Sequence, residues 1–76
     1  MRATIFSQMK MAKNIRLARE AKHMTKAEVA RTAGLVYTTY DSYERGDRCP
    51  PIGAIMRIGE AVGVKWYELI EGLKTE

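Results

Sequence analysis

Lysine and arginine side chains are the groups in this 76-residue sequence best suited to chemistry, because each can pair with a phosphate. They are unevenly distributed: residues 1–48 hold ten basic and five acidic residues, whereas residues 49–76 hold three basic and four acidic ones. The first part therefore carries +5 and the second −1. A basic surface attracts nucleic acid, although a surface that only keeps the protein in solution would have the same composition.

The sequence contains few residues that could form a catalytic or metal site. There is one cysteine, Cys49, and one histidine, His23, whereas a disulfide needs two cysteines and a structural zinc site needs four ligands. No nucleophile–base pair and no phosphate-cradling glycine loop is present. We therefore expect neither an enzyme nor a bound metal or cofactor. No apolar run approaches a membrane span and no secretory signal is evident, so we expect a cytoplasmic protein.

Glycine and proline divide the chain into segments of helical length. Apolar residues recur within them at helical spacing, and no segment alternates like a strand. The sequence predicts an all-α bundle of five helices. The first spans about residues 7–22, the second starts at residue 25, the third spans about 37–44, the fourth starts after Pro51, and the fifth covers about residues 66–70. Ser7 is the expected cap of the first. The residues expected inside are Met11, Ile15 and Ala18, then Val36, Tyr40 and Tyr43, and then Ile52, Ile55, Met56, Ile58 and Val62.

The stretch 25–46 has the layout of a helix-turn-helix. Thr25 and Glu28 have the spacing of a capping box, which starts a helix. Gly34 is suited to the left-handed turn that ends this helix, and Leu35 is expected to return to the core. A second short helix follows at once and ends at Gly46. In DNA-binding proteins the second helix of this motif enters the major groove.

The same region resembles the Xre family, which is the Cro and phage-repressor type of helix-turn-helix protein. The matching segments are 15–19 (IRLAR), 24–30 (MTKAEVA), 33–35 (AGL), 43–46 (YERG) and 58–64 (IGEAVGV). The family pattern covers residues 11–71 without a gap. Residues 1–10 are then an N-terminal extension of the first helix, and residues 72–76 a C-terminal tail. The resemblance implies a lambda-repressor-like fold and a transcription regulator that binds double-stranded DNA.

By position, the resemblance also implies roles for individual residues. Those that face bases are Tyr37, Thr38, Thr39 and Ser42, and those that contact phosphates are Lys26, Arg45 and Arg48. Arg19 and Glu44 match positions that form an ion pair between the first and third helices. The short hydroxyl side chains can approach base edges, and threonine methyls can touch a thymine methyl.

The sequence departs from the family pattern in three respects. None of the four base-facing residues is a Gln, Asn, Lys or Arg, which are strong bidentate base readers. Selectivity would then depend on Tyr37, on water-mediated contacts or on DNA shape. Val36 replaces the usual Ser or Thr cap of the third helix, and His23 stands where the family often has glycine, in a turn that a histidine tolerates at small cost.

The family usually binds a palindromic operator as a symmetric dimer. The near-neutral C-terminal part is the expected pairing surface, because the basic part must meet DNA. Its expected contacts are Val64, Trp66, Tyr67 and Ile70, with a role in the core as the alternative for Trp66. The rival surface is the apolar N-terminus around Ile5, Phe6 and Met9.

Several biological settings fit such a protein equally well. They are a phage Cro-like repressor, the controller of a restriction–modification system, and an antitoxin that represses its own operon. An alternative from another class is a protein-interaction module that kept the fold. The poor hydrogen-bonding capacity of the third helix supports that alternative.

Overall fold

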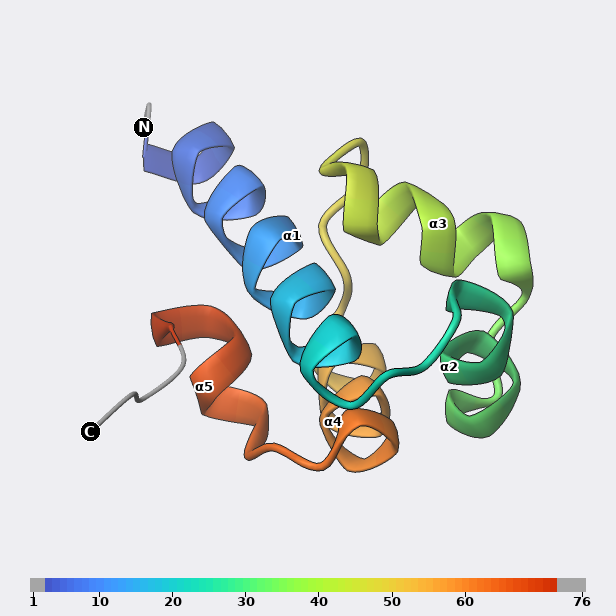
Figure 1. Ribbon diagram of the computed structural model, residues 1–76. Coiled ribbons are helices and arrows are strands. Elements are labelled where there is room, and N and C mark those ends of the chain that lie inside the picture. The colour runs from blue at the N-terminus through green and yellow to red at the C-terminus, as the bar shows by residue number, and fades with distance from the viewer. Residues whose placement is uncertain (1–2, 73–76) are drawn as a thin grey trace.

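A computed structural model describes residues 3–72 of the chain, and their side chains from Gln8 onwards. The described part folds into helices joined by short turns, with no strand among these residues. The helices are α1 (Ala3–Ala21), α2 (Lys26–Ala33), α3 (Tyr37–Arg45), α4 (Ile52–Val62) and α5 (Trp66–Glu71). Figure 1 shows α1 crossing the molecule between α3 and α5. The predicted all-α, five-helix fold is confirmed.

The ends of α2 follow from the local sequence. The Thr25 hydroxyl accepts a hydrogen bond from the Glu28 N–H at 3.1 Å, and the Glu28 carboxylate accepts one from the Thr25 N–H at 2.8 Å, which is the predicted capping box. Gly34 ends the helix with φ +72°. The Leu35 N–H then donates to the Ala30 carbonyl at 2.8 Å, so the chain reverses tightly into α3.

Helix α1 is longer than the sequence predicts. It begins at Ala3, so Ser7 lies inside the helix and is not its cap. Its C-terminal end agrees with the prediction: His23 has φ 59°, the left-handed conformation expected there, and its N–H donates to the Glu20 carbonyl at 3.0 Å. The expectation that Ile5 and Phe6 form an apolar surface concerns side chains outside the described part, as does most of the 72–76 tail.

Every helix sends one large side chain into the centre of the core. These fully buried residues are Ile15, Val29, Tyr40, Ile58 and Leu69. The predicted core residues of α1 are buried, as are Tyr43, Ile55 and Val62. Helices α2 to α5 have 6 to 11 residues, too few to be stable alone, so they depend on packing in this shared core.

Three residues expected in the core are exposed instead. Val36 is 69% exposed because it precedes α3 in an extended conformation and so lies off the helical stripe of Tyr40 and Tyr43. Ile52 and Met56 are 55% and 49% exposed. They lie four residues apart on one stripe of α4, while the stripe that contains Ile55, Ile58 and Val62 takes the core. Apolar type alone did not distinguish the two stripes.

Two side-chain amide contacts, one buried and one partly buried, fix α1 against its neighbours. Asn14 is buried, and its Nδ2 donates to the Leu69 carbonyl of α5 at 2.9 Å. Gln8 Nε2 donates to the carbonyl of Gly46, at the end of α3, at 2.8 Å. Neither residue was singled out from the sequence, because an amide on a helix gives no sign of a partner 55 or 38 residues away. No helix among residues 3–72 is long and apolar enough to cross a membrane.

Replacing Gly59 with alanine will destabilise the fold, by about 1–3 kcal/mol. A Cβ at this position of α4 would lie 3.0 Å from the Val64 carbonyl oxygen and 3.3 Å from the Trp66 Cα, and backbone cannot move aside cheaply. Urea unfolding of the two proteins measures the loss. Gly53→Ala is the matched control in the same helix, because nothing lies within 4 Å of its Cβ position. It should leave the stability unchanged or raise it slightly, and equal effects of the two substitutions would contradict the proposed clash.

Candidate DNA interface

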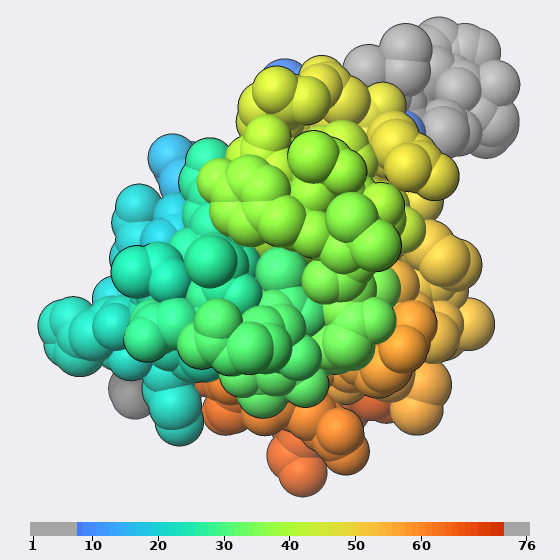
Figure 2. Space-filling model, turned by 90° about the vertical axis from the view of Figure 1, so that its right-hand side faces the viewer, coloured from blue at the N-terminus to red at the C-terminus, as the bar shows by residue number. Residues whose placement is uncertain are grey.

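The pair α2 and α3 forms one continuous face of the molecule. Figure 2 shows the two helices, in green and yellow-green, side by side over the centre of this face. The N-terminal end of α3 points outwards, since Val36, Tyr37 and Thr38 are all exposed. An exposed helix end with no other helix in front of it is what a major groove can accommodate.

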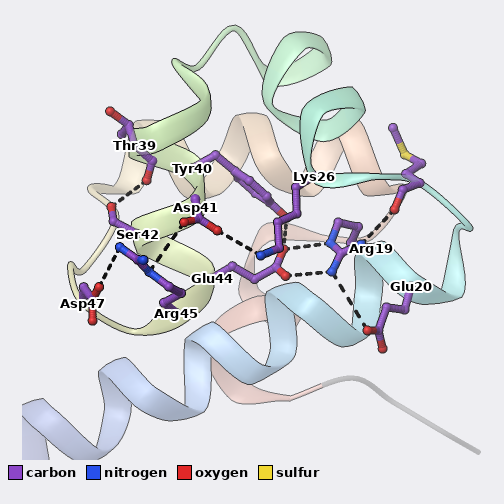
Figure 3. A network of polar contacts seen from close by, with 11 residues as sticks. Arg19, Glu20, Lys26, Thr39, Tyr40, Asp41, Ser42, Glu44, Arg45 and Asp47 are labelled. Carbon is purple, nitrogen blue, oxygen red and sulfur yellow. Dashed lines mark hydrogen bonds and ion pairs between the residues drawn. The ribbon is translucent and has the colours of Figure 1, made fainter.

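The four residues expected to face bases do not share one environment. Tyr37 is 46% exposed and Thr38 is exposed, whereas Thr39 is half-buried and Ser42 is only 7% exposed. The Ser42 hydroxyl donates to the Thr39 carbonyl at 2.7 Å (Figure 3). The chain after α3 folds back at this point, because the Asp47 N–H donates to the Ser42 carbonyl at 2.9 Å. Ser42 therefore has little exposed surface for the predicted base contact, and exposed Val36 stands beside Tyr37 and Thr38.

Arg19 of α1 and Glu44 of α3 lie against each other, as the resemblance implies. The Arg19 Nε and one terminal nitrogen each lie 2.8 Å from a different Glu44 carboxylate oxygen (Figure 3). The Tyr40 hydroxyl donates to Glu44 Oε2 at 2.6 Å, and Arg19 also donates to the Met24 carbonyl at 3.0 Å. The Glu44 side chain is 3% exposed and that of Arg19 is 13% exposed. This bidentate geometry locks the end of α3 to α1.

The surroundings of this pair shift the pKa values of its members. Burial alone would raise the pKa of Glu44, but the hydrogen bonds from Arg19 and Tyr40 outweigh it and lower the pKa below its ordinary value. The pKa of Arg19 is raised, chiefly by its hydrogen bond to Glu44. Burial and the adjacent Glu44 carboxylate raise the pKa of Tyr40 well above its usual range. The pair is therefore ionised, and Tyr40 neutral, at physiological pH.

Acidic residues lie beside two of the three expected phosphate contacts. Lys26 Nζ lies 2.9 Å from Asp41 Oδ1, so the pair joins the start of α2 to the middle of α3. Arg45 Nε lies 3.5 Å from Asp41 Oδ2, and its terminal nitrogen lies 2.9 Å from Asp47 (Figure 3). Arg48 is exposed and lies over the Tyr43 ring, 5.9 Å from its centroid. The hydrogen bond between Lys26 and Asp41 raises the pKa of Lys26 and lowers that of Asp41.

Asp41 is the site residue that sequence reasoning passed over. Its spacing of four from Arg45 does predict a pair on one helix. Its contact with Lys26 spans 15 residues and depends on how α2 and α3 cross, which the sequence does not specify. Among residues 3–72, no group of three His, Cys, Asp or Glu side chains is placed to hold a metal ion.

Comparison with known families agrees with this geometry. A family model described as Helix-turn-helix matches residues 15–69. The chain belongs to the helix-turn-helix family. It is a DNA-binding transcription regulator of the Xre type, as the sequence predicted. Proteins of this family are generally not enzymes.

Two solved structures are similar to this helix-turn-helix domain. The restriction-modification controller protein C.AhdI from Aeromonas hydrophila is 26% identical, with a TM-score of 0.78 over 82% of this chain and 94% of that one. A hypothetical transcription factor, NHTF, from Neisseria is 32% identical, with a TM-score of 0.79 over 83% of this chain and 72% of that one. No curated protein sequence matches the chain.

Proposed function

We propose that this regulator binds a palindromic DNA operator as a homodimer, with α3 of each copy in the major groove. The observation that carries the proposal is the exposed N-terminal end of α3, together with basic residues beside the middle of this helix and at and beyond its C-terminal end. Tyr37 and Thr38 project there, while Lys26 lies at the start of α2 and Arg45 and Arg48 lie at and beyond the end of α3. This order is that of a reading helix with phosphate contacts next to it in space and in sequence.

Base reading is assigned to Tyr37 and Thr38, with Thr39 at the edge of the contact. The Tyr37 hydroxyl supplies a hydrogen-bond donor and acceptor, and the Thr38 methyl can touch a thymine methyl. We assign the protein a binding role without a catalytic step and expect it to act in the cytoplasm. Among the three settings considered, similarity to C.AhdI over 94% of that protein supports control of a restriction–modification system.

The dimer is assigned to an apolar surface formed by α4 and α5. We define the α4–α5 surface by its exposed apolar side chains, which are Ile52, Met56, Trp66, Tyr67 and Ile70. Gly59 continues the stripe of Ile52 and Met56, and its backbone lies against that of Trp66, so the stripe leads towards α5. The Trp66 and Tyr67 rings meet edge to face, with centroids 5.5 Å apart. Exposed aromatic clusters of this kind commonly mark protein interfaces.

Pairing through this surface leaves the DNA face free. Helix α1 lies between α3 and α5, so the α5 part of this surface lies on a different side of the molecule from α3 (Figure 1). Trp66 is 40% exposed and is therefore available for such a contact. Val64, the fourth residue expected in the interface, is half-buried and packs against the core, so we assign it a supporting role.

Tyr37→Ala and Arg48→Ala will have different effects on DNA binding. Loss of Tyr37 removes a base contact, so affinity for the operator should fall by about 1–3 kcal/mol while affinity for random duplex stays the same. Loss of Arg48 removes a phosphate contact, so affinity for both should fall and the salt slope should decrease by about one unit. Fluorescence anisotropy at two salt concentrations, with an operator selected from a random duplex pool, measures both.

Lys22→Ala is the control for charge in this experiment. The Lys22 ammonium lies beside Gly63, at the end of α4, and so away from α3. Its removal should change the salt slope less than that of Arg48. Equal losses on operator and random DNA for Tyr37→Ala would show that Tyr37 does not read bases. Binding of no duplex at all by the parent protein would contradict the proposal and favour the protein-interaction alternative.

A further inference from the structure

The basic residues of the DNA face are partly neutralised by the protein itself. Lys26, Arg45 and Arg48 would offer three positive charges to phosphates. Asp41 and Asp47 lie within ion-pair distance of two of them, so the five residues together carry only +1. Asp41 is the more enclosed of the two acids, since its side chain is 19% exposed and that of Asp47 is 58% exposed.

Asp41 occupies the middle of the proposed contact surface. Tyr37, Asp41 and Arg45 are spaced by four residues and so lie on one stripe of α3. Each Asp41 carboxylate oxygen faces a different cation, with Lys26 at 2.9 Å on one side and Arg45 at 3.5 Å on the other. The carboxylate thus lies between the proposed base reader and the proposed phosphate contacts.

This arrangement affects random and specific DNA differently. Non-specific binding depends almost entirely on cations that reach phosphates. To contact a phosphate, Lys26 or Arg45 must either leave the Asp41 carboxylate or lie between two negative groups, the carboxylate and the phosphate, which repel each other. On an operator the same pairing holds Lys26 and Arg45 in fixed positions, which reduces the side-chain freedom lost on binding. That gain is available only where the DNA phosphates lie in the positions fixed by the base contacts of Tyr37 and Thr38.

We propose that Asp41 is a specificity-determining residue of this regulator, which competes with phosphates for Lys26 and Arg45 and thereby weakens binding to DNA without the operator. The proposal rests on the proposed function. It adds that Asp41 contributes to specificity without contacting a base. Its role is to position and partly neutralise the two cations.

Asp41→Asn tests the proposal, because asparagine has the same shape and can still accept a hydrogen bond from Lys26 but carries no charge. Affinity for a random duplex should rise about fivefold at low salt, which is the effect expected when one negative charge about 4 Å from a phosphate in water is eliminated. The salt dependence of this binding should also become steeper. Affinity for the selected operator should change less, so the ratio of the two affinities should fall. Asp41→Ala should lower that ratio in the same direction, and circular dichroism checks that both variants remain folded.

Asp47→Asn is the matched control. It removes the same charge from a pair whose two side chains are exposed, 59% for Arg45 and 58% for Asp47, and such a pair contributes little. It should alter the ratio less than Asp41→Asn does. An unchanged ratio for both Asp41 variants, or weaker binding of both to random DNA, would overturn the proposal. Loss of operator binding alone would overturn it as well, because it would make Asp41 a base reader. A parent protein that binds no duplex would instead contradict the proposed function, and this inference with it.

Discussion

Replacing Glu44 with alanine will lower the free energy of unfolding by about 3–5 kcal/mol. Glu44 is almost completely buried and is the shared partner of Arg19 and Tyr40. Its removal leaves a guanidinium that is 13% exposed with only the Met24 carbonyl and the more distant, exposed Glu20 carboxylate for partners. It also leaves the Tyr40 hydroxyl without an acceptor. Urea unfolding at neutral pH measures the loss.

Glu20→Ala is the matched control for this prediction. Glu20 also lies 4.0 Å from Arg19, but its side chain is 56% exposed, so its removal should change the stability by less than about 1 kcal/mol. Replacing Arg19 and Glu44 together with apolar residues should cost less than Glu44→Ala, because no buried charge is then left alone. Equal stabilities of Glu44→Ala and the parent would show that the pair does not hold α1 to α3.

The contribution of Glu44 should also depend on pH. Its pKa in the folded protein lies below the ordinary value, which is about 4.3 in an unfolded chain. The stabilisation is therefore complete above the unfolded pKa and is lost as pH falls through the lower, folded pKa. The difference in stability between the parent and Glu44→Gln should shrink over that acidic range. A difference that stays constant would show that the charge of Glu44 makes no contribution.

Introducing a charge on α5 will separate the proposed dimer and weaken operator binding by about a hundredfold or more, because two linked half-sites bind far more tightly than one. Tyr67→Glu and Ile70→Glu are the appropriate changes, since these side chains are 42% and 38% exposed. Val64 is less suitable because it packs against the core. Sedimentation gives the mass, and circular dichroism should show an unchanged helical signal.

Met9→Glu distinguishes the two proposed pairing surfaces. Met9 lies on α1 and is 56% exposed, and it belongs to the rival N-terminal surface. We expect this variant to remain dimeric. If Met9→Glu is monomeric while Tyr67→Glu and Ile70→Glu stay dimeric, the interface lies at the N-terminus. A parent protein that sediments as a monomer at micromolar concentration would contradict the proposed dimer.

Features that depend on neighbouring residues were the ones predictable from the sequence. The Thr25–Glu28 capping box and the turn at Gly34 are set within a few residues, and both are present. The stripe of α1 was also predictable, because Met11, Ile15 and Ala18 repeat at helical spacing. These local signals located helices along the chain, and the resemblance to the Xre family implied how the helices are arranged.

Features that depend on how helices cross could not be predicted in this way. Ile52 and Met56 are apolar like core residues, but the packing of α4 against α2, α5 and α1 decides which of its stripes is covered. Burial of Ser42 follows from the backward fold of the chain after α3. The contact between Lys26 and Asp41 depends on the packing of α2 against α3. The resemblance alone therefore could not show that Lys26, a predicted phosphate contact, already pairs with Asp41 in the protein.

The position of DNA on the protein is tested most directly by amide chemical-shift changes on titration with the selected operator. The account predicts that the largest changes fall on Tyr37, Thr38 and their neighbours at the start of α3, on Lys26, and on Arg48 beyond the end of α3. The amides of Tyr67 and Ile70 should change little, because the dimer is already formed. Changes confined to α4 and α5, or none at an excess of duplex, would contradict the claim that α3 reads DNA.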